Sequence, residues 1–287
     1  MKEEDEVHSR YRLRELKLEV THRCCLQCLH CSSEAGPHVF REMALADAMR
    51  IVGEANDMGV ATLAISGGEA VMWNGILPLL RRVADSGMKV SLYLSGVGGD
   101  TMPVMELMAS IPQARLIFSL YSHRSEVHDY ITQGHGSHAT TLDAIRSSVS
   151  LGVCTELHFT AMRLNYPDLL DVCRVAKVLG VSRVSVLRLV PQGRSRNATD
   201  GRFLTRQDNL QLRGLLGHAR SIINTRIGAP YGFLHVSDSP KCSAGVDQLI
   251  ILPDLKISPC DAFKQVKAEE LVGTDALRYS RLSRPNS

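Results

Sequence analysis

The sequence predicts an α/β protein, a partial (β/α)6 barrel with a small C-terminal β-hairpin extension. Six short runs typical of strands alternate with amphipathic stretches typical of helices. This repeat stops at a polar, glycine-containing break over residues 191–202. Residues 241–263 do not continue the strand–helix pattern and have a cysteine near each end. Because so few strand–helix units are visible, we expect an open or partly closed barrel, and not the eightfold closed one.

The elements alternate in a regular order along the first two-thirds of the chain. Glycine follows several of the predicted helices, at Gly59, Gly87, Gly152 and Gly180, where a left-handed residue stops a helix. Strands joined through helices pair in parallel by right-handed crossovers, so their carboxyl ends share one edge. The predicted strands are 16–20, 61–66, 89–94, 115–120, 155–161 and 183–189, and the predicted helices are 44–58, 74–86, 102–110, 140–151 and 168–179.

The sequence also suggests where the chain divides. We assign residues 1–200 to the barrel, 201–238 to a connecting region with one helix at about 205–224, and 239–287 to a C-terminal extension. Within the extension, "QLIIL" and "KIS" lie on either side of "PDL", a pattern that predicts a hairpin.

Composition limits the classes of function. A net charge of +3 over 287 residues is too mild to indicate nucleic acid as a partner. The N-terminus is charged, and no apolar run approaches the roughly 20 residues of a membrane-spanning helix. The eight cysteines do not follow the pattern of a short secreted protein. We therefore expect a cytoplasmic protein with reduced thiols and no membrane partner.

A cysteine-rich segment, "CCLQCLHC", directly follows the first predicted strand. Cys24, Cys28 and Cys31 form C-x3-C-x2-C, and three thiolates can hold a [4Fe-4S] cluster while one iron stays open. Zinc is the alternative, with His30 as a fourth ligand, in a non-catalytic regulatory protein. Structural zinc sites, however, usually draw a second pair of ligands from a distant stretch. Cys25 has no place in the pattern.

A second motif, "SGGEA", ends the second predicted strand and so lies at the same edge of the sheet. Gly67 and Gly68 would let the backbone approach a ligand closely. Glu69 can accept charge-assisted hydrogen bonds from an amino group.

Together the two motifs resemble those of the radical S-adenosylmethionine (SAM) superfamily, over about residues 14–195. "CCLQCLHC" is similar to that family's C-x3-C-x-Φ-C loop, with His30 at the usual aromatic position, and "GGEA" to its GGE motif, with Ala70 in place of a frequent proline. The resemblance implies a [4Fe-4S] cluster on Cys24, Cys28 and Cys31 whose open iron chelates SAM.

The resemblance further implies an enzyme that cleaves SAM reductively to a 5′-deoxyadenosyl radical. The radical would abstract a hydrogen atom from a small-molecule or peptide substrate, with the electron supplied by an external donor of the flavodoxin or ferredoxin type. The substrate and the reaction outcome stay open. The residues expected to contact the cofactor are His30, Gly67, Gly68, Glu69, Ser119 at the end of the fourth strand, and Arg188 on the sixth. Arg188, Arg194 and Arg196 would also suit an acidic or phosphorylated group.

A separate cysteine pair lies in the C-terminal extension. Cys242 and Cys260, in C-x12-L-x4-C, resemble the start of the auxiliary-cluster extension called SPASM or its shorter form, twitch. Leu255 stands where that pattern has glycine, and no cysteine follows Cys260. A second iron–sulfur cluster would therefore need other ligands, such as Asp261 or His235, and the sequence leaves it open.

Overall fold

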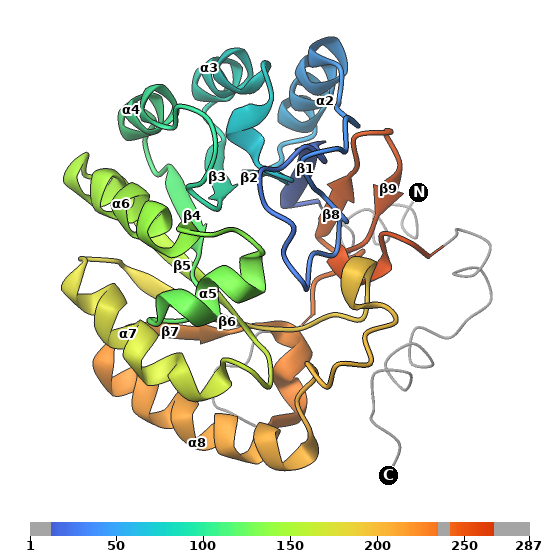
Figure 1. The fold of residues 1–287 in the computed structure, drawn as a ribbon. Coiled ribbons are helices and arrows are strands. Elements are labelled where there is room, and N and C mark those ends of the chain that lie inside the picture. The colour runs from blue at the N-terminus through green and yellow to red at the C-terminus, as the bar shows by residue number, and fades with distance from the viewer. Residues whose placement is uncertain (1–12, 235–241, 267–287) are drawn as a thin grey trace, which may run out of the picture.

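A single open sheet organises the protein, and the carboxyl ends of its parallel strands converge on the site discussed below (Figure 1). The structure is a computed structural model that describes residues 13–234 and 242–266. The described strands run in the order β7-β6-β5-β4-β3-β2-β1-β8-β9, and every neighbouring pair is parallel except β8 and β9. This confirms the predicted α/β class and the open, partial barrel.

The strands and helices alternate as expected apart from the added α5, and α2, α3, α4, α6, α7 and α8 lie outside the curved sheet (Figure 1). Among the described residues, none of the helices is both long and apolar enough to cross a membrane. The strands are β1 Glu15–Thr21, β2 Thr62–Gly67, β3 Lys89–Leu94, β4 Arg115–Ser119, β5 Cys154–Ala161, β6 Arg183–Arg188, β7 Thr225–Ile227, β8 Gln248–Ile251 and β9 Ile257–Ser258. The helices are α2 Leu45–Asp57, α3 Ile76–Ser86, α4 Met102–Ser110, α5 Ser125–Thr132, α6 Ser137–Ser150, α7 Leu169–Val178 and α8 Arg206–Ile222.

Two elements were not predicted. β7 has three residues and α5 has eight, so neither is long enough to show a clear hydrophobic period. β7 is placed by its parallel pairing with β6, a tertiary contact. The six strands predicted for the barrel are present, and the four helix-stopping glycines have φ between 72° and 77°. The connecting helix begins at a capping box formed by Thr205 and Asp208.

The predicted C-terminal hairpin is confirmed, and the structure adds where it lies. β8 pairs antiparallel with β9 and also in parallel with β1, Leu16 opposite Leu249. Leu255, in the turn, has φ 66°, a left-handed conformation that glycine adopts more easily. The extension therefore prolongs the barrel sheet beside the first strand. The proposed boundaries at residues 200 and 238 stay predictions.

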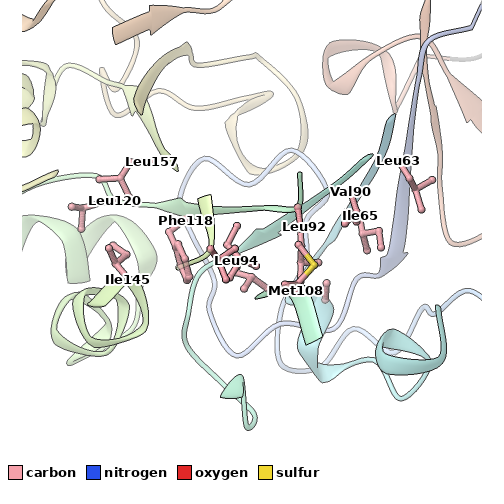
Figure 2. Close-up of a cluster of buried hydrophobic side chains, with 14 of the residues drawn as sticks. Leu63, Ile65, Val90, Leu92, Leu94, Met108, Phe118, Leu120, Ile145 and Leu157 are labelled. Atoms are coloured by element: carbon pink, nitrogen blue, oxygen red, sulfur yellow. The ribbon is translucent and has the colours of Figure 1, made fainter. Parts of the chain in front are cut away.

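The strands of the barrel have two different faces. Large apolar side chains such as Leu63, Leu92, Phe118 and Leu157 are fully buried in the layer between sheet and helices (Figure 2). Successive residues of a strand point to opposite faces, so the alternate positions point to the barrel interior. The apolar layer holds the fold together, while polar side chains such as Tyr93 are left to line the interior.

The apolar layer yields a stability prediction. Leu92 has 0% of its surface exposed, so Leu92→Ala should lower the free energy of unfolding by about 2–5 kcal/mol, because a cavity would remain in the packed layer. Urea unfolding followed by circular dichroism measures this. As a control, Val178→Ala, at a position 87% exposed, should change it by no more than about 0.5 kcal/mol. Equal effects of the two changes would contradict the packing described here.

Candidate functional site

The cysteine loop, defined as residues 22–36, joins the carboxyl end of β1 to the segment that leads into α2. Cys24 is buried, and Cys28 and Cys31 are half-buried in the same small apolar cluster. Burial raises the pKa of Cys28 well above its usual range, and the nearby Cys31 and Cys24 raise it further. Without metal the thiol is protonated, so binding iron would release its proton. Three soft ligands grouped in one loop suit an iron–sulfur cluster.

Cys25, which has no place in the C-x3-C-x2-C pattern, lies in the same cluster and makes a side-chain hydrogen bond with Cys24. Its Sγ also donates to the carbonyl of Val97, 2.9 Å away, after β3.

Backbone hydrogen bonds from other segments fix the shape of the cysteine loop. The amides of Gln27 and Leu29 donate to the carbonyls of Thr132 and Ile131 at the end of α5, at 3.1 and 2.9 Å. Arg194 supports the other side. Its Nε donates to the carbonyl of Cys28 at 2.7 Å and a terminal nitrogen donates to Ala35 at 2.9 Å.

Arg194 therefore has a different role from the one suggested by sequence. We expected Arg194 to suit an acidic group of a ligand, but its guanidinium is engaged with two carbonyls of the cysteine loop. A guanidinium group is planar, its N–H donors point in fixed directions and it has no acceptor. These two hydrogen bonds therefore define the orientation of the Arg194 side chain.

The two glycines of the GGE turn are required by the chain itself. A Cβ on Gly68 would lie 2.2 Å from the carbonyl oxygen of Arg23, and one on Gly67 would lie 2.2 Å from that of Thr21. The amides of Gly68 and Glu69 donate to the carbonyls of Thr21 and Arg23 at 2.6 and 2.9 Å. The backbone of the GGE turn is thus approached closely, as expected, by the backbone that leads into the cysteine loop. Contact of these glycines with a cofactor stays a prediction.

Glu69 is fully buried at the edge of this turn. One carboxylate oxygen accepts from the amide of Ser95, at 2.8 Å, and from its hydroxyl. The other, Oε1, is buried without a hydrogen-bond partner among the residues described. Burial raises the pKa of Glu69 to about 7, although the bonds from Ser95 oppose that shift. An unpaired buried oxygen calls for a donor, and an amino group of a ligand would supply one.

His30 and Ser119 meet at one side chain that the sequence did not single out, Tyr121. The ring of His30 packs edge-on against Tyr121, with 4.6 Å between ring centroids. Ser119, at the end of β4, makes a side-chain hydrogen bond to Tyr121. Burial lowers the pKa of His30 to about 3, so the ring is neutral and takes the aromatic role expected at its position. Tyr121 falls two residues after β4, in "FSLYS". This position near the carboxyl end of a strand is the sequence feature that could have indicated Tyr121 as a site residue.

Arg188 lies at the carboxyl end of β6, beside an aromatic residue. Its guanidinium carbon is 5.1 Å from the ring centroid of Phe233, and burial lowers its pKa. The expected contact of Arg188 with the cofactor stays a prediction.

At the C-terminal pair, Cys242 is exposed and Cys260 is half-buried. Burial raises the pKa of Cys260 to about 11, with smaller increases from Asp261 and from Cys242. The carboxylate of Asp261, proposed as an extra cluster ligand, is bound by two ammonium groups, Lys17 at 3.0 Å and Lys264 at 2.5 Å. These two ion pairs occupy it, so the structure does not present it as a ligand. His235 lies outside the described residues, and a second cluster stays a prediction.

The zinc alternative can be compared with the same geometry. A structural zinc ion takes four ligands at once. In residues 13–234 and 242–266, no three His, Cys, Asp or Glu side chains are grouped closely enough to hold one metal ion. In a [4Fe-4S] cluster each cysteine binds a different iron atom, so its ligands do not share one ion.

Comparison with known proteins agrees with these motifs. The family profile described as "Radical SAM superfamily" matches residues 18–176, more than half of the chain. This family uses a [4Fe-4S] cluster and SAM.

Individual relatives are more distant. The antilisterial bacteriocin subtilosin biosynthesis protein AlbA of Bacillus subtilis (strain 168) is 25% identical over 247 residues, 85% of this chain and 54% of AlbA. PqqA peptide cyclase of Ruegeria pomeroyi is 25% identical over 86% of this chain and 67% of the cyclase. The chain thus spans about half the length of AlbA and two-thirds of that of the cyclase.

Among solved structures, Streptococcus suis SuiB bound to the precursor peptide SuiA superposes with a TM-score of 0.77, at 16% identity, over 97% of this chain and 67% of that one. At this level of identity the likeness concerns the fold alone.

The turn packed on the cysteine loop can be tested through stability. Gly68→Ala should destabilise the chain strongly and expose the Cys24 thiol, because the added methyl group would displace the Arg23 carbonyl. Calorimetry and the rate of thiol labelling measure the two effects. Gly214→Ala in α8 is the matched control, since its Cβ would meet nothing within 4 Å and alanine favours a helix. A Gly68→Ala protein that melts and labels like wild type would contradict the described packing.

Glu69 gives a prediction of pH dependence for the chain without cofactors. Its pKa is raised from 4.5 to about 7 on folding, so the folded chain binds the proton more tightly than the unfolded chain. The stabilisation is complete below pH 4.5 and is lost as the pH rises to about 7. Relative to Glu69→Gln, the wild-type free energy of unfolding should fall by about 3 kcal/mol over this window.

Urea unfolding at several pH values measures this difference. Glu106→Gln, at an exposed position on α4, is the control and should not reproduce it. A constant difference between wild type and Glu69→Gln from pH 4.5 to 7 would mean that the carboxyl group titrates normally.

Proposed function

The chain belongs to the Radical SAM superfamily, and from this premise we propose that it is an enzyme that modifies a peptide by radical chemistry. When bound, the cluster and SAM would supply a 5′-deoxyadenosyl radical able to abstract a hydrogen atom. Cys24, Cys28 and Cys31 would hold the cluster. SAM would be surrounded by His30, Gly67, Gly68, Glu69 and Ser119. Arg188, at the carboxyl end of β6, would also contact it.

One observation carries this proposal. The pKa of the Cys24 thiol is raised by its hydrogen bond with Cys25, by burial and, to a smaller extent, by the charge of Glu69. The buried Glu69, with its unpaired Oε1, therefore lies near that thiol. A ligand that offers an amino group beside a metal bound to the cysteine loop would satisfy the carboxylate. SAM has an α-amino group of this kind, and Ser95 holds the other carboxylate oxygen in place.

A peptide is the favoured substrate because the relatives that match over most of the chain include a bacteriocin biosynthesis protein and a peptide cyclase. The barrel interior suits a polar backbone. Lys17 Nζ lies 5.2 Å from the ring centroid of Tyr93, which contacts the ring of His158 edge-on at 5.3 Å. We further propose an external one-electron donor and a reducing, cytoplasmic compartment, in which these thiols stay free.

The first experiment measures iron and sulfide per chain after anaerobic reconstitution, together with 5′-deoxyadenosine formed from SAM under dithionite. Wild type should bind about four irons and form deoxyadenosine slowly, and Cys28→Ala should lose both. Cys154→Ala, which removes an exposed cysteine outside the loop, is the matched control and should keep both. About eight irons would support a second cluster at Cys242 and Cys260. A colourless wild-type protein that contains zinc would overturn the proposal.

The substrate class needs a separate test. Extract of the source organism, divided by molecular size, should stimulate deoxyadenosine formation through its peptide fraction. Treatment of that fraction with protease should abolish the stimulation. Stimulation that survives protease would assign a small-molecule substrate instead.

A further inference from the structure

Four charged side chains form a network beneath the cysteine loop, in which Glu19 and Lys264 are buried and the side chain of Asp261 is 40% exposed. Lys264 is only 4% exposed, and its ammonium contacts Glu19, itself 1% exposed, and Asp261 at 2.5 Å. Asp261 also binds Lys17 at 3.0 Å. Two cations thus balance two anions, as a buried group of charges requires. The network joins the middle of β1 to the residues that follow Cys260.

The same ammonium also reaches the cysteine loop. Lys264 Nζ donates to the hydroxyls of Ser33 at 3.1 Å and Ser32 at 3.3 Å, directly after Cys31. Ser33 in turn donates to Glu19 at 3.0 Å. Lys264 is therefore the point at which the network and the cysteine loop are connected.

The next residue makes a second attachment. Gln265 donates to the carboxylate of Glu34 at 2.8 Å and accepts from the amide of Gly193 at 3.3 Å. Gly193 packs on the carbonyl of Cys31, where a Cβ would come within 2.2 Å of the oxygen. The C-terminal residues thus hold the part of the loop that follows Cys31 both directly and through the segment after β6.

From these contacts we propose that Asp261, Lys264 and Gln265 form a clasp that holds the cysteine loop in its cluster-binding shape, with Lys264 as the positioning residue. The proposal rests on the proposed function in one respect, that the loop binds the cluster. The clasp gives the C-terminal extension a structural role that does not depend on a second iron–sulfur cluster. The positive charge of Lys264 also offsets the negative charge that thiolates and a reduced cluster bring to the loop.

The clasp predicts local effects of Lys264→Met. In the cluster-free chain, backbone amides of residues 22–36 should exchange hydrogen faster, while those of β3, β4 and β5 stay protected. In the reconstituted protein, loss of iron to a chelator should be about tenfold faster than in wild type. Lys256→Met is the matched control, because this lysine lies in the hairpin that precedes Lys264 and its side chain is 77% exposed, so the variant should behave like wild type.

A double variant separates charge from position. Lys264→Met leaves the network with an unbalanced anion, so the reduction potential of the cluster should fall. Glu19→Gln with Lys264→Met keeps the Lys17–Asp261 pair and restores the balance. Its potential should return toward the wild-type value while its iron loss stays fast. Equal potentials in the wild type and both variants would refute the charge effect.

The outcomes distinguish this proposal from the proposed function. Wild-type rates of exchange and iron loss in Lys264→Met would overturn the clasp. Faster exchange throughout the sheet would also overturn it, because Lys264 would then only stabilise the fold. A wild-type chain that binds no iron would defeat the proposed function, while exchange in the cluster-free chain would still decide the clasp.

Discussion

The structure of the site depends on satisfying the backbone of an irregular loop. Residues 22–36 have few hydrogen bonds of their own, yet buried amides and carbonyls need partners. The end of α5, the GGE turn and Arg194 supply them from three separate places in the sequence. Lys264 adds hydrogen bonds to the hydroxyls of Ser32 and Ser33. A parallel sheet makes this arrangement feasible, because all its carboxyl ends meet at one edge. These contacts give the loop a defined shape.

The barrel interior is organised by charge, in contrast to the apolar layer under the helices. At the amino ends of β4–β6, Glu156 lies between Arg115 at 3.3 Å and Arg183 at 2.6 Å. Nearer the cysteine loop, Glu19 and Lys264 form the second centre. Buried charges require partners in fixed positions, so both groups restrict how the strands can sit relative to one another. Tyr93 and His158 lie on this same interior face, with 5.3 Å between their ring centroids.

Several site residues contact distant parts of the chain that sequence reasoning did not identify. The glycines of the GGE turn were expected beside a cofactor, which stays a prediction, and the structure adds that they pack against the carbonyls of Thr21 and Arg23. Arg194 was expected to bind an acidic group, and it holds Cys28 instead. In both cases the residue type was informative. Glycine indicated that another group approaches the backbone closely, and arginine indicated a side chain that donates several hydrogen bonds. The partner comes from a distant part of the chain and has no local signal.

The sequence by itself determined the six barrel strands, the helix ends at glycine, the hairpin and the grouping of Cys24, Cys28 and Cys31. All of these depend on spacing or conformational preference within a few residues. Only the tertiary structure decided that β8 pairs with β1, that Tyr121 joins His30 to Ser119, and that Lys264 reaches Ser33 from 231 residues away. These contacts arise from the packing of distant segments, and the physical reason is that a buried charge or ring takes whichever partner the fold places beside it.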